Sequence, residues 1–230
     1  NFYENKQLPR VLLLSGEKGI GKFTLANHFI NYIFTKNTNY AYDKKNNIIN
    51  SKSKIYKQIN EGTFQNLVIL NSDTKIENVR NLKLQLSKSS INNGPRFILI
   101  DDVETFNHNS MNALLKILEE PTGENYFILI DNKTTKLLET VSSRCLKINV
   151  FISREKINKI TAHIKNFYNL DFVIDNSNFN ISPGSFLRFN KICIDNDLSE
   201  KSLIFFRSLV VFIKVYMVII ISFTTATIRY

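Results

Sequence analysis

Apolar and polar residues alternate in short blocks along the chain, and this pattern predicts strands connected by helices. Short apolar runs typical of buried strands lie at residues 10–14, 67–70, 96–100, 126–130 and 146–150. Apolar positions at helical spacing predict helices at residues 24–34, 76–86, 111–120 and 137–143. Strands that alternate with helices imply an α/β fold with a mostly parallel sheet and helices on both of its faces.

Two local signals refine this pattern. Ser110 is of a type that caps helices, and Pro121 would stop the helix that follows it. Residues 35–60 are rich in Asn and Lys, so we expect a polar insertion that is partly disordered.

The pattern changes after Val150. Ser153 is positioned to cap a helix at residues 154–168, and a polar stretch then leads to a second helix from about Ser185. Short helices without a further strand indicate a small helical domain. We therefore expect an α/β domain at residues 1–150, a helical domain at 151–198 and a separate C-terminal region at 199–230.

Net charge narrows the classes of partner. The chain of 230 residues carries a formal net charge of +10, which suits a partner with phosphates, such as a polynucleotide. We interpret the lysines as scattered along the sequence, so a Lys- and Asn-rich proteome explains the charge equally well.

Cysteine usage and the N-terminus bear on location. Cys145 and Cys193 are the only cysteines, too few for a disulfide framework or a Cys-rich zinc site, and a reducing cytoplasm fits. The first residue is Asn1 rather than Met, and no signal peptide follows. We therefore expect a cytoplasmic protein of which this chain is a fragment.

A phosphate-binding motif follows the first predicted strand. In the segment SGEKGIGKFTLANHF, Gly16, Gly21 and Lys22 have the Walker A spacing G-x-x-x-x-G-K. Backbone N–H groups from Gly19 to Lys22 would point at a β-phosphate of ATP or ADP, and Lys22 would reach the β- and γ-oxygens. A glycine turn before a helix is the alternative, but the flanking strand and helix favour the motif.

The motif departs from its usual form at the next residue. Phe23 stands where a Ser or Thr hydroxyl normally binds Mg²⁺. Thr24 lies about 100° further round the helix, so we expect that it does not substitute. The sequence therefore predicts that nucleotide binding can survive without a proper Mg²⁺ site.

Acidic and amide residues end two later strands. Asp101 and Asp102 close the third strand as in a Walker B motif, in which Asp101 would hold a metal through water. Position 102 is usually Glu, and the shorter Asp would place the attacking water poorly. Asn132 ends the fourth strand, where it either contacts a γ-phosphate or water, or simply opens a turn.

One arginine completes the candidate residues. Arg144 lies in the short polar segment SSRC before the fifth strand. It is either an arginine finger directed at the nucleotide of a neighbouring subunit or a surface arginine, and these residues alone favour the surface arginine.

Taken in order, these motifs resemble the AAA+ clamp-loader subunits of bacterial DNA polymerase III. The resemblance rests on GEKGIGKFTLA, FILIDDVETFNHNSMNALLKILEEP, YFILIDN and SSRC, and it covers about residues 8–150. SPGS at residues 182–185 resembles a turn of the family's lid domain. The resemblance implies an AAA+ P-loop domain, a small helical lid domain and the truncated start of a helical collar.

Two kinds of subunit share these motifs. The motor kind has intact Walker A and B motifs with a four-cysteine zinc module between them, whereas the delta-prime kind lacks a working ATPase centre but keeps the SRC arginine. Phe23, Asp102 and the absence of cysteine between the two motifs resemble the delta-prime kind. An active AAA+ ATPase, in which Thr24 or a water replaces the missing ligand, remains the alternative.

If the delta-prime resemblance holds, it implies a set of roles. The subunit would have no ATPase activity of its own and no zinc, and Arg144 would complete the ATP site of an adjacent motor subunit. The implied partners are the motor and delta-type subunits of the loader, the sliding clamp, and primed DNA through the complex.

The C-terminal segment does not resemble the family's collar. Residues 203–223 contain 17 apolar residues in 21, interrupted by Arg207, Lys214 and two serines. The length would allow a bilayer span. We favour a shortened collar helix or a corrupted end, and expect no membrane association.

Overall fold

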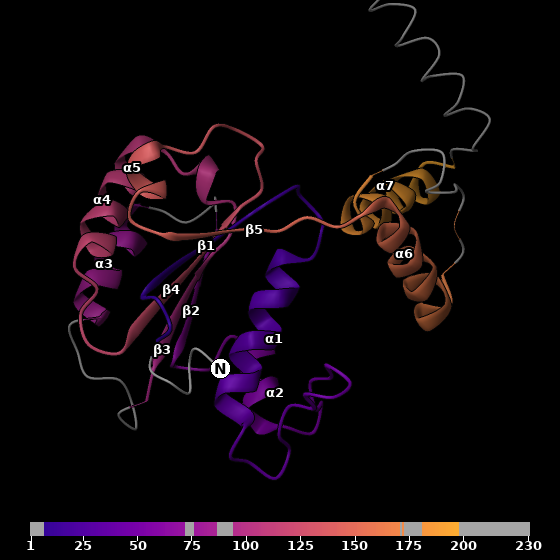
Figure 1. The fold of residues 1–230 in the computed structure, drawn as a ribbon, viewed down its shortest axis with the longest axis horizontal. Coiled ribbons are helices and arrows are strands. Elements are labelled where there is room, and N and C mark those ends of the chain that lie inside the picture. The colour runs from indigo at the N-terminus through magenta and orange to yellow at the C-terminus, as the bar shows by residue number, and fades with distance from the viewer. Residues whose placement is uncertain (1–6, 72–75, 87–93, 171, 173–180, 198–230) are drawn as a thin grey trace, which may run out of the picture. The chain divides into compact units, whose positions relative to one another are not determined.

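The computed structural model describes residues 7–71, 76–86, 94–170, 172 and 181–197 (Figure 1). The chain divides into two compact units, residues 1–152 and 153–230. The sequence pattern placed this border two residues earlier, after Val150. The expected border between residues 198 and 199, and the apolar segment 203–223, lie outside the described residues.

The first unit is built on a five-stranded parallel sheet of order β2-β3-β4-β1-β5 (Figure 1). Its strands are β1 (Val11–Ser15), β2 (Leu67–Leu70), β3 (Arg96–Ile100), β4 (Asn125–Asp131) and β5 (Leu146–Asn149). Because all strands run in the same direction, the residues that follow β1, β3 and β4 meet at one edge of the sheet. The predicted α/β class is confirmed, and the predicted strand bounds hold to within one residue.

Helices cover both faces of this sheet. The helices of the first unit are α1 (Lys22–Thr35), α2 (Lys54–Asn60), α3 (Ile76–Leu86), α4 (His108–Glu119), the short α5 (Glu139–Ser142) and the 3₁₀ helix η2 (Val103–Thr105). In Figure 1, α3 and α4 lie on one side of the strands, and α1 and α2 lie on the other.

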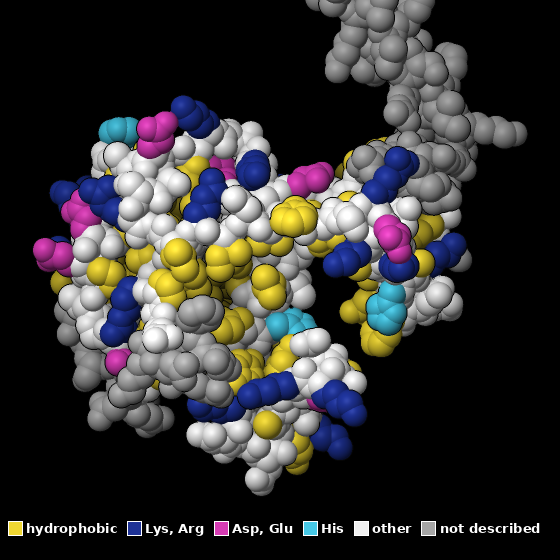
Figure 2. Space-filling model, in the orientation of Figure 1, with side chains coloured by type: hydrophobic (Ala, Val, Ile, Leu, Met, Phe, Trp, Pro, Cys, Tyr) yellow, Lys and Arg dark blue, Asp and Glu magenta, His cyan; other side chains and the backbone are white. Residues whose placement is uncertain are grey.

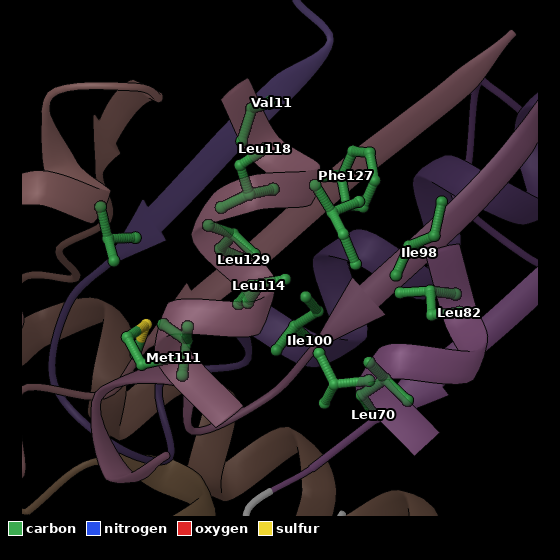
Figure 3. Packing of buried hydrophobic residues seen from close by; sticks show 14 of the residues in the cluster. Val11, Leu70, Leu82, Ile98, Ile100, Met111, Leu114, Leu118, Phe127 and Leu129 are labelled. Carbon is green, nitrogen blue, oxygen red and sulfur yellow. The ribbon is translucent and has the colours of Figure 1, made fainter. Parts of the chain in front are cut away.

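Alternate residues of the central strands enter two separate cores. Ile98 and Ile100 of β3 pack with side chains of α3 and α4 (Figure 3). Phe97 and Leu99 of the same strand pack on the opposite face with residues of α1 and α2. Burying a side chain of this size stabilises the fold by roughly 1.5–3 kcal/mol, so this alternation sets which face each helix covers.

Aromatic rings organise the core on the α1 side. Phe97 is fully buried, and its ring stacks on Tyr126 with a centroid distance of 5.4 Å. Phe29 and Phe34 of α1 contact the same ring edge-on at 6.2 and 5.8 Å. Such pairs add about 0.5–1.5 kcal/mol each beyond burial, which holds α1 against the middle of the sheet.

The prediction for residues 35–60 is wrong in part. The end of this segment forms α2, whose first turn is capped by Ser53, the acceptor of the Tyr56 N–H at 3.4 Å. Ile59 of α2 is buried in the core, and Asp43 and Ile48 form a backbone bridge. The sequence pattern does not indicate this ordered structure, because the segment is mostly polar and only a few apolar side chains anchor it to the core.

The expected cap of α4 is also wrong. The helix begins at His108, and Asn107 is its N-cap, since Asn107 Oδ1 accepts the Ser110 N–H at 2.8 Å. Ser110 lies in the first turn, where its buried hydroxyl has no hydrogen-bond partner in the structure. Ser and Asn both favour N-cap positions. Asn107 takes the role here because its side-chain oxygen accepts an N–H of the first turn.

The second unit contains two described helices, α6 (Arg154–Tyr168) and α7 (Pro183–Asp195). Ser153 caps α6 as predicted, with its hydroxyl accepting the Lys156 N–H at 3.5 Å. The second helix begins two residues earlier than expected because Pro183 fits its first turn. Among the residues that the structure describes, no helix is long and apolar enough to cross a membrane.

The cap assignment of α4 is directly testable. Asn107→Ala removes the acceptor for the Ser110 N–H, and we expect it to lower the free energy of unfolding by about 1 kcal/mol. Ser110→Ala removes a hydroxyl that bonds to nothing, so it should leave stability unchanged or slightly raised. Urea denaturation of the two variants checks this, and a larger loss in Ser110→Ala would return the cap to Ser110.

Candidate functional site

The loop between β1 and α1 has the geometry of an anion cradle. Gly19 and Gly21 have φ angles of 86° and 93°, in the left-handed region that glycine adopts without strain. Gly21 is the N-cap of α1, with no side chain capping the helix and no acid in its first turn. The N–H groups of this first turn and the helix dipole therefore suit a negatively charged group.

Gly16 allows the loop to pass close to the end of β5. A Cβ atom at this position would lie 2.2 Å from the carbonyl oxygen of Val150 and 2.8 Å from Ile20 Cδ1. The Val150 N–H donates to the Ser15 carbonyl at 2.8 Å, and the Gly16 N–H donates to the Asp131 carbonyl at 3.1 Å. The start of the loop is thus held between two strands.

Lys22, the lysine of the motif, is turned onto its own loop. Its side chain is buried, and Nζ donates to the carbonyl oxygens of Gly16 at 2.8 Å and Glu17 at 2.7 Å. Burial lowers the pKa of the Lys22 ammonium, and the charges of nearby carboxylates, Asp101 foremost, offset only part of that effect. These two bonds use two of the three N–H donors of the ammonium group.

The two residues after Lys22 point to solvent. Phe23 is 39% exposed, and Thr24 is also exposed on the first turn of α1. No oxygen ligand therefore follows Lys22 at the position where the motif normally supplies one. That Thr24 does not replace it remains a prediction.

The structure brings Asp101, Asp102 and Asn132 together at the carboxyl edge of the sheet. Asn132 Nδ2 donates to Asp101 Oδ1 at 3.2 Å and to Asp102 Oδ1 at 2.8 Å. This contact arises because β3 and β4 are neighbours in the sheet. Asn132 is therefore bound to the acidic pair and is more than a turn opener.

Lys18, which the sequence analysis did not identify, forms an ion pair with Asp102. Its Nζ donates to both carboxylate oxygens of Asp102, at 2.9 and 3.0 Å. Burial raises the pKa of Asp102, but the hydrogen bonds from Lys18 and Asn132 outweigh it, so the net pKa lies below the usual range. Asp102 itself adopts a left-handed backbone with φ 51°, which aims its side chain at the loop.

Glu104 is a second residue that the motifs did not indicate. It is buried, and its Oε1 accepts the Asn132 N–H at 3.1 Å and the Thr134 hydroxyl at 2.7 Å. Its Oε2 is buried without a hydrogen-bond partner in the structure. Glu104 thereby holds the backbone that presents Asn132 to the acidic pair.

Arg144 lies away from this group. Its guanidinium donates to Glu119 Oε1 at 2.8 Å and to the Thr140 carbonyl at 2.8 Å, and its side chain is 35% exposed. Arg144 shortly precedes Leu146, which is paired with Leu12 near the start of β1. The phosphate loop begins at Ser15, the other end of β1. Arg144 therefore lies at the amino ends of the strands and the phosphate loop at their carboxyl ends.

The arrangement suits the phosphates of a nucleotide better than it suits a metal ion beside them. The loop glycines and Lys22 fit phosphate oxygens, since the helix N-terminus carries no side-chain cap. The residues that normally serve the metal and the attacking water fit less well, because position 23 offers a phenyl ring in place of a hydroxyl and Asp102 is paired with Lys18. A bound nucleotide would thus depend on Gly16, Gly19, Gly21 and Lys22 rather than on a metal.

The chain is similar to known proteins of one family. A family model described as DNA polymerase III, delta subunit, matches residues 1–152. The chain is 34% identical over 158 residues to the DNA polymerase III subunit gamma of Buchnera aphidicola, which covers 66% of the chain and 41% of that protein. It is 29% identical over 146 residues to the subunit delta' of Pseudomonas aeruginosa, which covers 61% of the chain and 43% of that protein.

Among solved structures, the chain is similar to a gamma-subunit-related protein of Thermotoga maritima, with 19% identity and a TM-score of 0.48. That match covers 69% of the chain and 45% of the other protein. The chain spans less than half the length of the Buchnera and Pseudomonas proteins it matches.

The Lys18–Asp102 contact has a titratable signature. In Lys18→Met the burial of Asp102 remains while the two hydrogen bonds that its carboxylate accepts from Lys18 are lost, so we expect the pKa of Asp102 to rise. A lowered carboxyl pKa stabilises the fold above the unfolded pKa of about 4, and this contribution is lost as pH falls. The stability difference between wild type and variant should therefore shrink under acid conditions.

Carbon-detected NMR titration of the Asp102 carboxyl measures this shift. Asp43 is the internal control, because its pKa is lowered by Asn46 rather than by a lysine side chain. An unchanged Asp102 pKa in Lys18→Met would show that the ion pair does not form in solution.

Proposed function

The chain belongs to the DNA polymerase III delta subunit family, and on this premise we propose that it is a non-hydrolysing subunit of the clamp loader that acts in DNA replication. In this role it supplies Arg144 to the nucleotide of a neighbouring subunit while that neighbour hydrolyses ATP. Its partners are other clamp-loader subunits of motor and delta type and, through the assembled complex, the sliding clamp and primed DNA.

The observation that carries the non-hydrolysing role is the state of the acidic pair. Phosphoryl transfer requires a metal held beside the phosphates and a residue that orients the attacking water. Here Asp102, at the position of the water-orienting residue, accepts two hydrogen bonds from Lys18 and one from Asn132. Together with Phe23, this supports a site that retains the phosphate loop but lacks both catalytic functions.

The position of Arg144 supports action on a different subunit. An arginine finger must reach a γ-phosphate, and Arg144 lies at the amino edge of the sheet while its own phosphate loop lies at the carboxyl edge. Its ion pair with Glu119 is half exposed, with side-chain exposures of 35% and 49%. Exposed pairs of this kind are worth only about 0–1 kcal/mol, so Arg144 can exchange Glu119 for a partner's phosphate at small cost.

A hollow between α3 and α4 supports the proposed approach of DNA. It has a volume of about 330 Å³ and is lined by Val79, Arg80, Lys83, Asn109, Asn112, Ala113, Lys116 and Ile117. The charged residues in this described lining are all cations, accompanied by two amides that can donate to phosphate oxygens. This composition suits a nucleic acid backbone.

An active ATPase of the clamp-loader type is the second candidate. It is favoured by the intact loop spacing and by the similarity to a gamma subunit. In that case, the bonds of Lys18 to Asp102 would have to break when nucleotide and metal bind.

The role of Arg144 is tested in a reconstituted clamp loader. We expect Arg144→Ala to leave this subunit folded but to slow ATP hydrolysis at the site that receives the arginine by roughly 10³-fold or more. The turnover of the whole complex should fall by the fraction of total ATP hydrolysis that this site contributes. Steady-state phosphate release in the presence of primed DNA is the measurement.

Arg10→Ala is the matched control, because Arg10 is also a surface arginine beside an acid, 4.0 Å from Glu124. It should leave turnover unchanged. Glu119→Gln removes the charge that pairs with Arg144 and should not slow hydrolysis. Equal turnover in wild type and Arg144→Ala would contradict the proposal.

A further inference from the structure

The positive charge of the chain is concentrated in one segment. Residues 36–57 contain six lysines and a single acid, Asp43, and so carry half of the net charge of +10. The expectation of scattered lysines is therefore wrong for this part of the chain. All six lysines are exposed: Lys36, Lys44, Lys45, Lys52, Lys54 and Lys57. Figure 2 shows several Lys and Arg side chains on the lower part of the first unit, which contains α2 and this segment, besides others over its upper and left parts.

The segment is ordered against α1 by specific contacts. The Tyr42 N–H donates to Thr35 Oγ1 at 2.9 Å, and the Tyr42 hydroxyl lies 3.0 Å from His28 Nδ1. Asp43 Oδ1 accepts the backbone N–H groups of Lys45 and Asn46 at 2.9 and 3.1 Å, which closes the turn before Ile48. The lysines of this turn are thus presented from a built loop.

Between this loop and α1 lies an aromatic pocket of about 280 Å³. It is lined by Leu25, His28, Phe29, Tyr32, Tyr42, Lys44 and Asn47. Lys44 Nζ lies 4.6 Å from the centre of the Tyr32 ring, and the Tyr42 ring meets those of Tyr32 and His28 edge-on. The lining therefore combines aromatic rings, a cation and an amide, and its described residues include no carboxylate.

We propose that the pocket and the surrounding lysines form a binding surface for single-stranded nucleic acid, which we call the α1–α2 surface. Proteins that bind single strands combine aromatic contacts to bases with cations along the backbone. The pocket supplies the first feature and the lysines of residues 36–57 supply the second. The surface is distinct from the phosphate loop and from Arg144, so it does not rest on the proposed clamp-loader role.

An acidic protein would satisfy the lysines but would leave the aromatic pocket unexplained. The pocket favours a ligand that carries planar bases as well as negative charge. DNA and RNA share this chemistry, so the test includes both.

The test is a fluorescence anisotropy titration of the full chain with labelled oligothymidine and oligouridine of about 20 nucleotides. We expect Lys44→Glu/Lys45→Glu to weaken binding at least about 10-fold and to reduce the salt dependence by the equivalent of one or two phosphate contacts. Binding of either strand that is weakened in this variant supports the proposal, and the tighter of the two shows whether the surface prefers DNA or RNA.

Lys156→Glu/Lys191→Glu is the matched control, because it changes net charge equally at exposed positions of α6 and α7. It should alter affinity less than about 3-fold, because neither lysine belongs to the pocket or to residues 36–57. Thermal unfolding confirms that both double variants remain folded.

Two further ligands test the contribution of the pocket. An abasic strand of the same length should bind at least about 5-fold more weakly than oligothymidine, because base stacking is lost. Polyglutamate should compete poorly. Equal losses in the two double variants, equal binding of the abasic strand, effective competition by polyglutamate, or no binding to either labelled strand would each overturn the proposal.

Discussion

Lys18 donates hydrogen bonds to both carboxylate oxygens of Asp102, and the proposed lack of hydrolysis depends first on this contact. The contact places a protein cation between the phosphate loop and the acidic edge, in a region where a nucleotide site needs carboxylates available for a metal and for water. The pair is partly exposed, with side-chain exposures of 40% for Lys18 and 21% for Asp102, and Asn132 donates a further hydrogen bond to the same carboxylate. The loss of a hydroxyl at Phe23 acts in the same direction. Both features support the proposal that the loop keeps its phosphate-binding backbone without hydrolysing ATP.

This contact exists only because of the order of the strands. Lys18 follows β1 and Asp102 follows β3, and β4 separates these two strands in the sheet. Asn132, at the end of β4, fills the space between them and bonds to both acids. Glu104 then holds Asn132 through its backbone. In the same parallel sheet, Arg144 precedes β5 and therefore lies at the amino ends of the strands. The topology thus accounts for both the Lys18–Asp102 contact and the position of Arg144.

Much of the fold follows from local pattern, and the site follows only in part. β2, β3, α3 and α6 have the predicted bounds because each is a clear apolar run or an amphipathic helix with a defined end. Phe23 and Asp102 were visible because a motif fixes what should stand there. Lys18 occupies a variable position of the motif, and its partner is 84 residues away, so no local pattern could indicate the pair. The order within residues 35–60 was hidden for a similar reason, since Tyr42 and Thr35 join through a hydrogen bond rather than an apolar repeat.

The central claim is that this chain carries a phosphate loop without hydrolysing ATP. The most direct test is phosphate release by the purified chain alone, with ATP and Mg²⁺, compared between wild type and Lys22→Ala. The account predicts no release above background from either protein. Release from wild type that falls in Lys22→Ala would contradict it.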